Sequence, residues 1–111
     1  EVKWLANKTK NLRIFEDDEE KMNLSLEDVK GKVLIISQFT LYGNSIKGNR
    51  PSFIEAAKPD FAKELYLKFI EEFKSFGIET QEGEFGADMK VELLNDGPVT
   101  IIIDTKDANI K

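Results

Sequence analysis

KVLIISQFTL, residues 32–41, is the stretch that decides the fold of this 111-residue chain. Residues 33–36 are four consecutive aliphatic side chains, and Val33, Ile35 and Ile36 are β-branched. A short continuous run of this kind is typical of a strand that is buried on both faces of a sheet. We therefore expect a central strand over residues 32–39.

The polar end of this stretch is a first candidate site. Ser37, Gln38 and Thr40 follow the aliphatic run, with Phe39 between them. Two hydroxyls and an amide thus lie where a buried strand leaves the sheet, which is a common place for sites in α/β proteins. Threonine also favours strands for reasons unrelated to function. Taken alone, the segment also fits an ordinary strand end.

The clearest element further along the chain is a helix. Aromatic and aliphatic residues recur at spacings of four and three, at Phe61, Leu65, Phe69, Phe73 and Phe76, with Ile70 beside them. Such a stripe predicts an amphipathic helix that packs on a core, rather than a ligand cage. Pro59 and Asp60 are suitable for its start and Gly77 for its end.

Weaker patterns outline the rest of the fold. They predict a helix over residues 1–10, extended segments over 11–15 and 22–26, a turn at 27–31, a polar loop at 42–51, strands over 78–85, 89–94 and 99–104, and a frayed tail over 105–111. This order predicts an α/β fold in which helices cover one side of a mixed sheet.

A Gly-Pro step, Gly97-Pro98, separates the last two predicted strands. Proline has no N–H, and glycine tolerates backbone angles that other residues avoid. The segment fits a hairpin turn. It also fits a sharp turn that presents bare peptide groups to a ligand.

Composition limits the chemistry. The chain has no His and no Cys, so imidazole, thiolate and cysteine-bound zinc chemistry are excluded, and we expect neither a metal nor a cofactor. The absence of Cys also fits a cytoplasmic location, and we expect no membrane partner because no apolar run approaches a membrane span. A net charge of −5 argues against broad phosphate-backbone binding, and so against DNA as a partner. Lys47 and Arg50 form the one compact basic patch.

Several segments taken together resemble one family. Residues 37–41, 47–53, 85–89 and 95–100 occur in an order, and with residues, similar to those of D-aminoacyl-tRNA deacylases, first described as D-tyrosyl-tRNA deacylases. Residues 11–15 and 22–25 fit the same pattern. The resemblance covers residues 4–104. Members of that family carry further residues before the position of Glu1, so we expect a single deacylase domain over residues 1–111 that is truncated at its N-terminus.

The resemblance implies a function and a fold. The family's enzymes hydrolyse the ester that joins a D-amino acid, or glycine, to the 3′ end of tRNA, and thereby proofread chirality in translation. They are homodimers with the active site near the subunit interface. Their mixed, largely antiparallel, barrel-like sheets and helices form three layers.

The resemblance also assigns residues. Thr40 matches a residue once taken as the nucleophile, while Ser37, Gln38 and Phe39 line the pocket. Met89 and Asn95 match positions in the substrate pocket. The Gly97–Pro98 bond is expected to be cis and to reach into the partner's pocket, where it excludes L-aminoacyl groups; an X-Pro bond needs only about 0.5–1 kcal/mol to become cis.

The lack of any base favours a mechanism without a covalent intermediate. A Thr hydroxyl without a neighbouring base is a poor nucleophile. We expect the Phe39 and Thr40 backbone N–H groups to stabilise the oxyanion. We expect the 2′-hydroxyl of the terminal adenosine to position or activate the attacking water. Lys47 and Arg50 either hold phosphates of the tRNA acceptor end or form a solvated basic loop.

Two alternatives remain at this point. One is a paralogous editing deacylase with another specificity, such as the animal-type enzyme that removes L-alanine or the editing domain of archaeal threonyl-tRNA synthetase. The other is a non-catalytic RNA-binding or interaction module that kept the fold, a class that the net negative charge mildly favours over a tRNA hydrolase.

Overall fold

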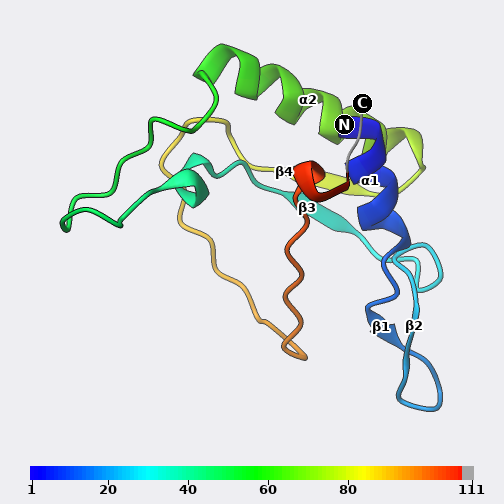
Figure 1. Ribbon diagram of the computed structural model, residues 1–111. Coiled ribbons are helices and arrows are strands. Elements are labelled where there is room, and N and C mark those ends of the chain that lie inside the picture. The colour runs from blue at the N-terminus through cyan, green and yellow to red at the C-terminus, as the bar shows by residue number, and fades with distance from the viewer. Residues whose placement is uncertain (109–111) are drawn as a thin grey trace.

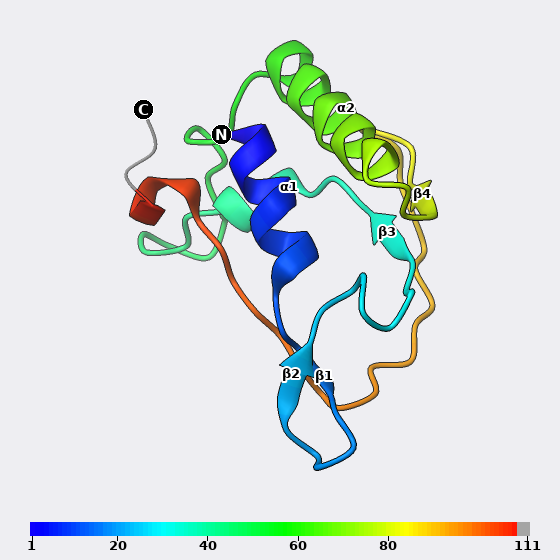
Figure 2. The same ribbon diagram turned by 90° about the vertical axis from the view of Figure 1, so that its right-hand side faces the viewer.

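The computed structural model describes residues 1–108 as a mixed α/β arrangement (Figures 1 and 2). Its elements, in chain order, are α1 (Val2–Asn11), β1 (Phe15–Glu16), β2 (Met22–Leu24), β3 (Val33–Ile35), the 3₁₀ turn η1 (Phe39–Tyr42), α2 (Pro59–Ser75), β4 (Thr80–Glu82) and the 3₁₀ turn η2 (Thr105–Ala108). The predicted fold class is confirmed. None of the helices in this part of the chain is long and apolar enough to cross a bilayer.

The strands form two separate pairs. β1 and β2 make an antiparallel hairpin that extends from the end of α1, with Phe15 opposite Leu24 (Figure 2). β3 and β4 are parallel, with Val33 opposite Thr80 and Ile35 opposite Glu82. Parallel neighbours need a long crossover connection, and α2 lies within that connection.

α2 has the ends that its sequence predicts. Pro59 begins the helix, where its missing N–H is not needed, and Asp60 lies in the first turn. Gly77 follows the helix with a φ of 76°, a left-handed conformation that glycine adopts without strain.

The core lies between α1, α2 and β3. Its buried side chains are Ala6, Ile35, Ile70 and Phe73. The Phe73 ring centroid is 5.2 Å from that of Phe69 and 5.6 Å from that of Phe76, which confirms the core-packing interpretation of the aromatic stripe. Phe61, however, lies in the first turn of α2 and is 57% exposed, and it is not among the side chains that pack on this core.

The central strand is shorter than predicted. β3 ends at Ile35, and Leu34 is 56% exposed, so only one face of the strand is covered. Residues 39–42 form η1 instead of continuing the strand. The Gln38 side chain explains the change, because its oxygen accepts the Thr40 N–H and so offers the backbone an alternative to a strand partner.

The predictions of strands over 89–94 and 99–104 are wrong for this structure, and the strand predicted over 78–85 shortens to β4. Leu94 and Ile102 are 92% and 91% exposed. Apolar runs become strands only where a neighbour supplies backbone hydrogen bonds, and within residues 1–108 these two runs pair with nothing.

The predicted frayed tail is ordered in its first part. The Thr105 hydroxyl donates to the Glu1 carboxylate at 2.8 Å, which holds η2 beside the start of α1. The remainder of that prediction, residues 109–111, lies outside the described residues.

Candidate functional site

The candidate site is built on η1, directly after β3. Gln38 precedes the turn, and its Oε1 atom accepts a hydrogen bond of 2.6 Å from the Thr40 hydroxyl and a longer one of 3.4 Å from the Thr40 N–H. The Gly43 N–H donates to the Thr40 carbonyl at 2.9 Å and closes the turn. Ser37, in the link from β3, is half-buried. The structure thus brings Gln38 and Thr40 into direct contact.

These contacts bear on the role of Thr40. Its hydroxyl donates to an amide oxygen, which is not a base, so the contact does not activate it for attack. The backbone N–H of Phe39 has no hydrogen-bond partner within residues 1–108. The turn therefore offers one free and one weakly bound N–H group.

An aromatic contact supports the outer side of the turn. Phe39 is 60% exposed, and its ring meets the Phe53 ring edge-on at 5.2 Å between centroids. A Cβ atom at Gly43 would lie 2.9 Å from the Phe53 ring and 3.0 Å from the Thr40 carbonyl. Glycine is needed at residue 43 because the ring and the turn approach so closely there.

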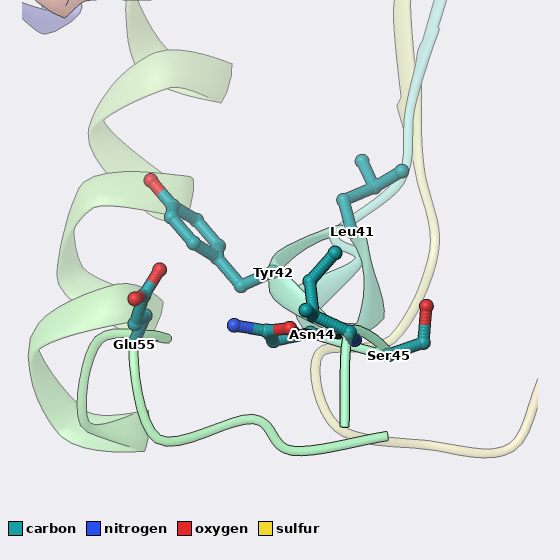
Figure 3. A pocket seen from close by; sticks show the side chains of 7 residues that line it. Leu41, Tyr42, Asn44, Ser45 and Glu55 are labelled. Atoms are coloured by element: carbon teal, nitrogen blue, oxygen red, sulfur yellow. Dashed lines mark hydrogen bonds between the residues drawn. The ribbon is translucent and has the colours of Figure 1, made fainter. Parts of the chain in front are cut away.

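An open hollow lies beside η1 (Figure 3). Its lining consists of Leu41, Tyr42, Gly43, Asn44, Ser45, Ile46 and Glu55. Sequence reasoning missed Tyr42, Ser45 and Glu55 as site residues. No local pattern marks them, since they lie in or beside a loop whose polar residues are ordinary for loops.

Lys47 and Arg50 are carried by a closed loop next to this hollow. Asn44 and Ser52 exchange two backbone hydrogen bonds, of 2.8 and 2.9 Å, and the intervening residues form the loop. Both basic side chains are exposed, and within residues 1–108 neither forms an ion pair. Both predicted basic residues are therefore exposed on the loop that borders the hollow.

Met89 packs beside Gly83, at the end of β4. A Cβ atom at Gly83 would come within 2.5 Å of the Met89 sulfur and 4.0 Å of Ile36. Met89 therefore packs where β3 and β4 end, next to the segment that leads into η1. Asn95 is exposed in the irregular segment that follows.

The prediction of a cis bond before Pro98 is wrong for this structure. No cis peptide bond occurs in residues 1–108. Residues 95–98 are exposed and lie at the tip of a long loop, away from η1 (Figure 1). Without packing to hold the less stable isomer, the trans preference of about 0.5–1 kcal/mol decides the geometry. Gly97 does have an unusual backbone, with a φ of 145°.

A carboxylate cluster is not part of this site. Within residues 1–108, no group of three or more potential metal-binding side chains comes together. The chemistry of η1 is therefore that of backbone N–H groups, an amide and hydroxyls.

Comparison with known proteins gives the family. The family model described as D-Tyr-tRNA(Tyr) deacylase matches residues 1–104. The chain belongs to the D-Tyr-tRNA(Tyr) deacylase family. Three relatives named D-aminoacyl-tRNA deacylase, from Fusobacterium nucleatum, Desulfotalea psychrophila and Thermosipho africanus, are 93%, 59% and 55% identical to it. The matches cover 100%, 96% and 96% of this chain and 74%, 71% and 71% of the respective relatives.

A solved structure supports the deacylase-family fold. The c-Myc DNA Unwinding Element Binding Protein superposes with a TM-score of 0.80 and is 38% identical in sequence. The match covers 91% of this chain and 69% of that one.

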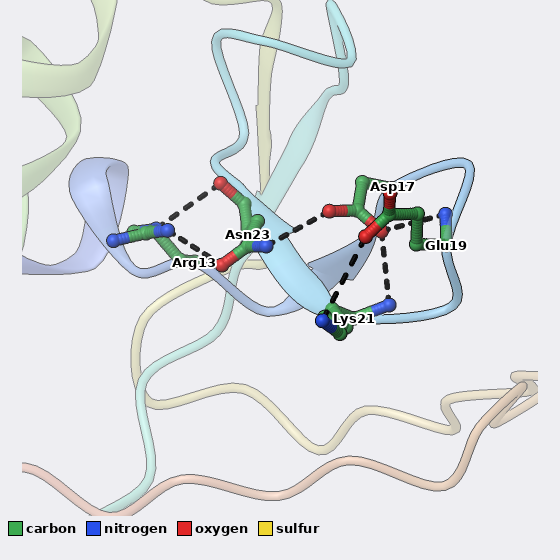
Figure 4. A network of polar contacts seen from close by, with 5 residues as sticks. All are labelled: Arg13, Asp17, Glu19, Lys21 and Asn23. Carbon is green, nitrogen blue, oxygen red and sulfur yellow. Dashed lines mark hydrogen bonds and ion pairs between the residues drawn. The ribbon is translucent and has the colours of Figure 1, made fainter.

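A second polar network orders the β1–β2 hairpin of this deacylase-family chain (Figure 4). Arg13 donates to the backbone and side-chain oxygens of Asn23, and the Asn23 amide donates to Asp17 at 2.8 Å. Asp17 also accepts the Glu19 and Lys21 N–H groups, at 2.9 and 3.0 Å. The bond from Asn23, followed by those from the backbone, lowers the pKa of Asp17 below its ordinary value of 3.8. The network joins residues 11–15 and 22–25, two segments on which the family resemblance rests.

Proposed function

We propose that this protein hydrolyses the ester bond of D-aminoacyl-tRNA and releases a free D-amino acid and tRNA. The observation that carries the proposal is the match to the deacylase family over residues 1–104, with relatives of that name up to 93% identical across the full chain. The protein is accordingly a hydrolase that edits charged tRNA.

The chemistry follows from η1. A water molecule adds to the ester carbonyl, and the carbonyl oxygen gains negative charge. The Phe39 N–H group, and the Thr40 N–H group once it leaves its 3.4 Å contact with Gln38, donate hydrogen bonds to that oxygen. One such donor contributes roughly 3–4 kcal/mol to lowering the barrier.

The remaining steps need only substrate groups and solvent. The C–O bond to the ribose breaks, the 3′-oxygen takes up one proton of the water, and the amino acid leaves as a carboxylate as the second proton passes to solvent. The 2′-hydroxyl of the terminal adenosine relays the proton from the attacking water to the 3′-oxygen. Thr40 forms no covalent intermediate, because its hydroxyl already donates to the Gln38 amide and faces no base.

Selection between D and L substrates is assigned to the Gly97-Pro98 step. A wall made of backbone excludes an L side chain sterically, and glycine passes because it has no side chain. This assignment also accounts for hydrolysis of glycyl-tRNA. Two features support it: Gly97 has a φ that disfavours any side chain, and Pro98 is rigid. Met89 is assigned to the pocket of its own subunit, and Asn95, which lies beside the Gly97-Pro98 step, to the pocket of the other subunit.

Binding of the tRNA end is assigned to Lys47 and Arg50. Their exposed side chains on the closed loop beside η1 suit phosphate contacts. We also assign the protein to a homodimer, with the Gly97-Pro98 step of one subunit serving the pocket of the other, and to the cytoplasm, where charged tRNA is used.

A nucleic-acid-binding role without catalysis is the second candidate. It is favoured by the structural neighbour, whose name describes a DNA-binding protein. The net charge of −5 weighs against it for duplex DNA, since nonspecific DNA binding depends on positive charge.

Deacylation of D-Tyr-tRNA by the purified protein tests the proposal. We expect release of free D-tyrosine well above the buffer rate. Binding of tRNA or duplex DNA without any ester hydrolysis would favour the second candidate and contradict the first. Rapid hydrolysis of an L-aminoacyl-tRNA with no action on the D ester would instead indicate a paralogous specificity.

A further inference from the structure

Tyr66 reaches from α2 to the point where β3 and β4 end. Its hydroxyl lies 3.0 Å from the Ile35 carbonyl and 3.3 Å from the Gly83 carbonyl, and its single proton is shared between these two acceptors. The Gly83 N–H donates to the same Ile35 carbonyl at 3.1 Å. One side chain thus fastens the last residue of β3 to the first residue after β4.

Both fastened residues lead directly into the deacylase site. Ile35 is two residues before Ser37 and three before Gln38, which directly precedes η1. Gly83 packs on the other side against the Met89 sulfur. Tyr66 is therefore bound to the starts of the two chain segments that carry the oxyanion donors and the pocket wall.

Few other hydrogen bonds hold the ends of β3 and β4 together. β3 and β4 have three residues each, and the Gly83–Ile35 bond is the last one of the ladder. The Tyr66 ring rests on Phe85, with 5.7 Å between centroids. Burial, and secondarily the Glu82 carboxylate, raise the pKa of Tyr66 above its ordinary value of 10.0. The hydroxyl therefore keeps its proton throughout the neutral range.

We propose that Tyr66 is a positioning residue for the deacylase reaction, whose hydroxyl holds the Ile35 and Gly83 carbonyls so that η1 and Met89 stay in register. This inference rests on the proposed function. Oxyanion donors act only when they are placed within a fraction of an ångström of the developing charge. A strand end that frays by one hydrogen bond would move the Phe39 and Thr40 N–H groups out of that range.

The test is Tyr66→Phe in the whole protein, with kcat and KM for D-Tyr-tRNA measured per folded molecule. The substitution keeps the ring and its contact with Phe85 and removes only the hydroxyl. We expect kcat to fall roughly 10- to 100-fold, as for a small misplacement of catalytic groups, while KM stays within about twofold. Thr9→Val is the matched control, because the Thr9 hydroxyl also donates to a backbone carbonyl, that of Leu5 at 2.8 Å, but within α1. It should leave kcat unchanged.

A third variant separates positioning from folding. Replacing Tyr66 by 4-aminophenylalanine restores a donor at the same place and should return kcat to near the wild-type value. Three results would overturn the role given to Tyr66. The first is an unchanged kcat in Tyr66→Phe, and the second is failure of Tyr66→Phe to fold. The third is a 4-aminophenylalanine variant that is as slow as Tyr66→Phe. An inactive wild type would overturn the deacylase function together with this inference, whereas an active wild type with an equally active Tyr66→Phe would overturn the inference alone.

Discussion

At the scale of single residues, the hydrogen bond between Thr40 and Gln38 decides which mechanism fits. A nucleophilic hydroxyl needs a base to take its proton, whereas the Thr40 hydroxyl donates a hydrogen bond to an amide oxygen at 2.6 Å, which is not a base. In the proposed mechanism, the group of Thr40 that acts is its backbone N–H, which every residue type except proline would retain.

Thr40→Ala is therefore expected to lower kcat by less than about tenfold, far less than the 10⁴-fold or greater loss that follows removal of a true nucleophile. The measurement is single-turnover hydrolysis of D-Tyr-tRNA, alongside thermal unfolding to show that η1 survives. A complete loss of activity in a folded variant that still binds tRNA would mean that Thr40 attacks the ester.

The backbone conformation of Gly97 leads to a second prediction. Its φ of 145° is unfavourable for any side chain, and a Cβ atom there would lie 3.2 Å from the Val99 nitrogen. Gly97→Ala should therefore shift residues 96–99 and lower the ratio of D to L hydrolysis by roughly tenfold, equivalent to about 1.4 kcal/mol.

Gly77→Ala is the matched control for this change. Gly77 also has a left-handed backbone, with a φ of 76°, but no atom lies within 4 Å of an added Cβ and the residue is far along the chain from the site. The Gly77→Ala variant should therefore unfold at a lower temperature than the wild type but keep the wild-type ratio of D to L hydrolysis. Equal D-to-L ratios in Gly97→Ala and the wild type would remove the step from chiral selection.

At the scale of elements, local signals explain what the sequence could predict. Proline at the start of α2, glycine after it and the aromatic spacing all act within a few residues, so the helix was predicted with its ends. The runs over 89–94 and 99–104 are as apolar as strands, but a strand also needs a neighbour. The alternation at residues 22–26 likewise indicated an extended segment without showing that it pairs with β1.

The β1–β2 hairpin provides a prediction about pH. The native hydrogen bonds lower the pKa of Asp17, so its ionised form stabilises the fold above the unfolded value of 3.8, and this stabilisation is lost as the pH falls through the lower folded value. Asp17→Asn should therefore unfold at a lower temperature than the wild type at pH 7, and the difference should close well below pH 3.8.

Thermal unfolding followed by circular dichroism between pH 7 and pH 2 checks this. Asp18→Asn is the control, because Asp18 is exposed and takes no part in the hairpin network. A gap between Asp17→Asn and the wild type that persists at the lowest pH would show that Asp17 acts through packing instead of charge.

At the scale of the whole molecule, binding of tRNA must work against a net charge of −5. A local basic loop makes this possible, because only a short stretch of acceptor end has to be held. Lys47→Ala and Arg50→Ala should each raise KM for the charged tRNA. Each should also make the slope of log binding constant against log salt concentration shallower. The expected change is about 0.7 for every phosphate that the variant no longer neutralises, which is the value for single strands.

A titration of tRNA affinity against salt concentration measures that slope. Lys68→Ala is the control, since Lys68 pairs with Glu64 at 3.1 Å on the exposed side of α2. Equal slopes for all three variants and the wild type would leave residues 44–52 as an ordinary solvated loop.

The sequence predicts the residues that follow β3, but it does not predict which loop residues line the hollow. The order of motifs was enough to indicate the family, and Ser37, Gln38 and Thr40 do lie together after β3. Tyr42 and Glu55 line the hollow without any sequence signal, because a hollow arises from how loops fold back. Residues 95–98 lie away from η1, since no strand among residues 1–108 pairs with the segment around them and brings it closer.

Hydrolysis of D-Tyr-tRNA and L-Tyr-tRNA by the same purified protein, followed side by side, tests the central claim most directly. The account predicts that the D ester is cleaved at least roughly 100-fold faster than in buffer, a modest acceleration for an enzyme, and that the L ester decays at the buffer rate. Decay of both esters at the buffer rate, in a protein shown to be folded, would contradict it.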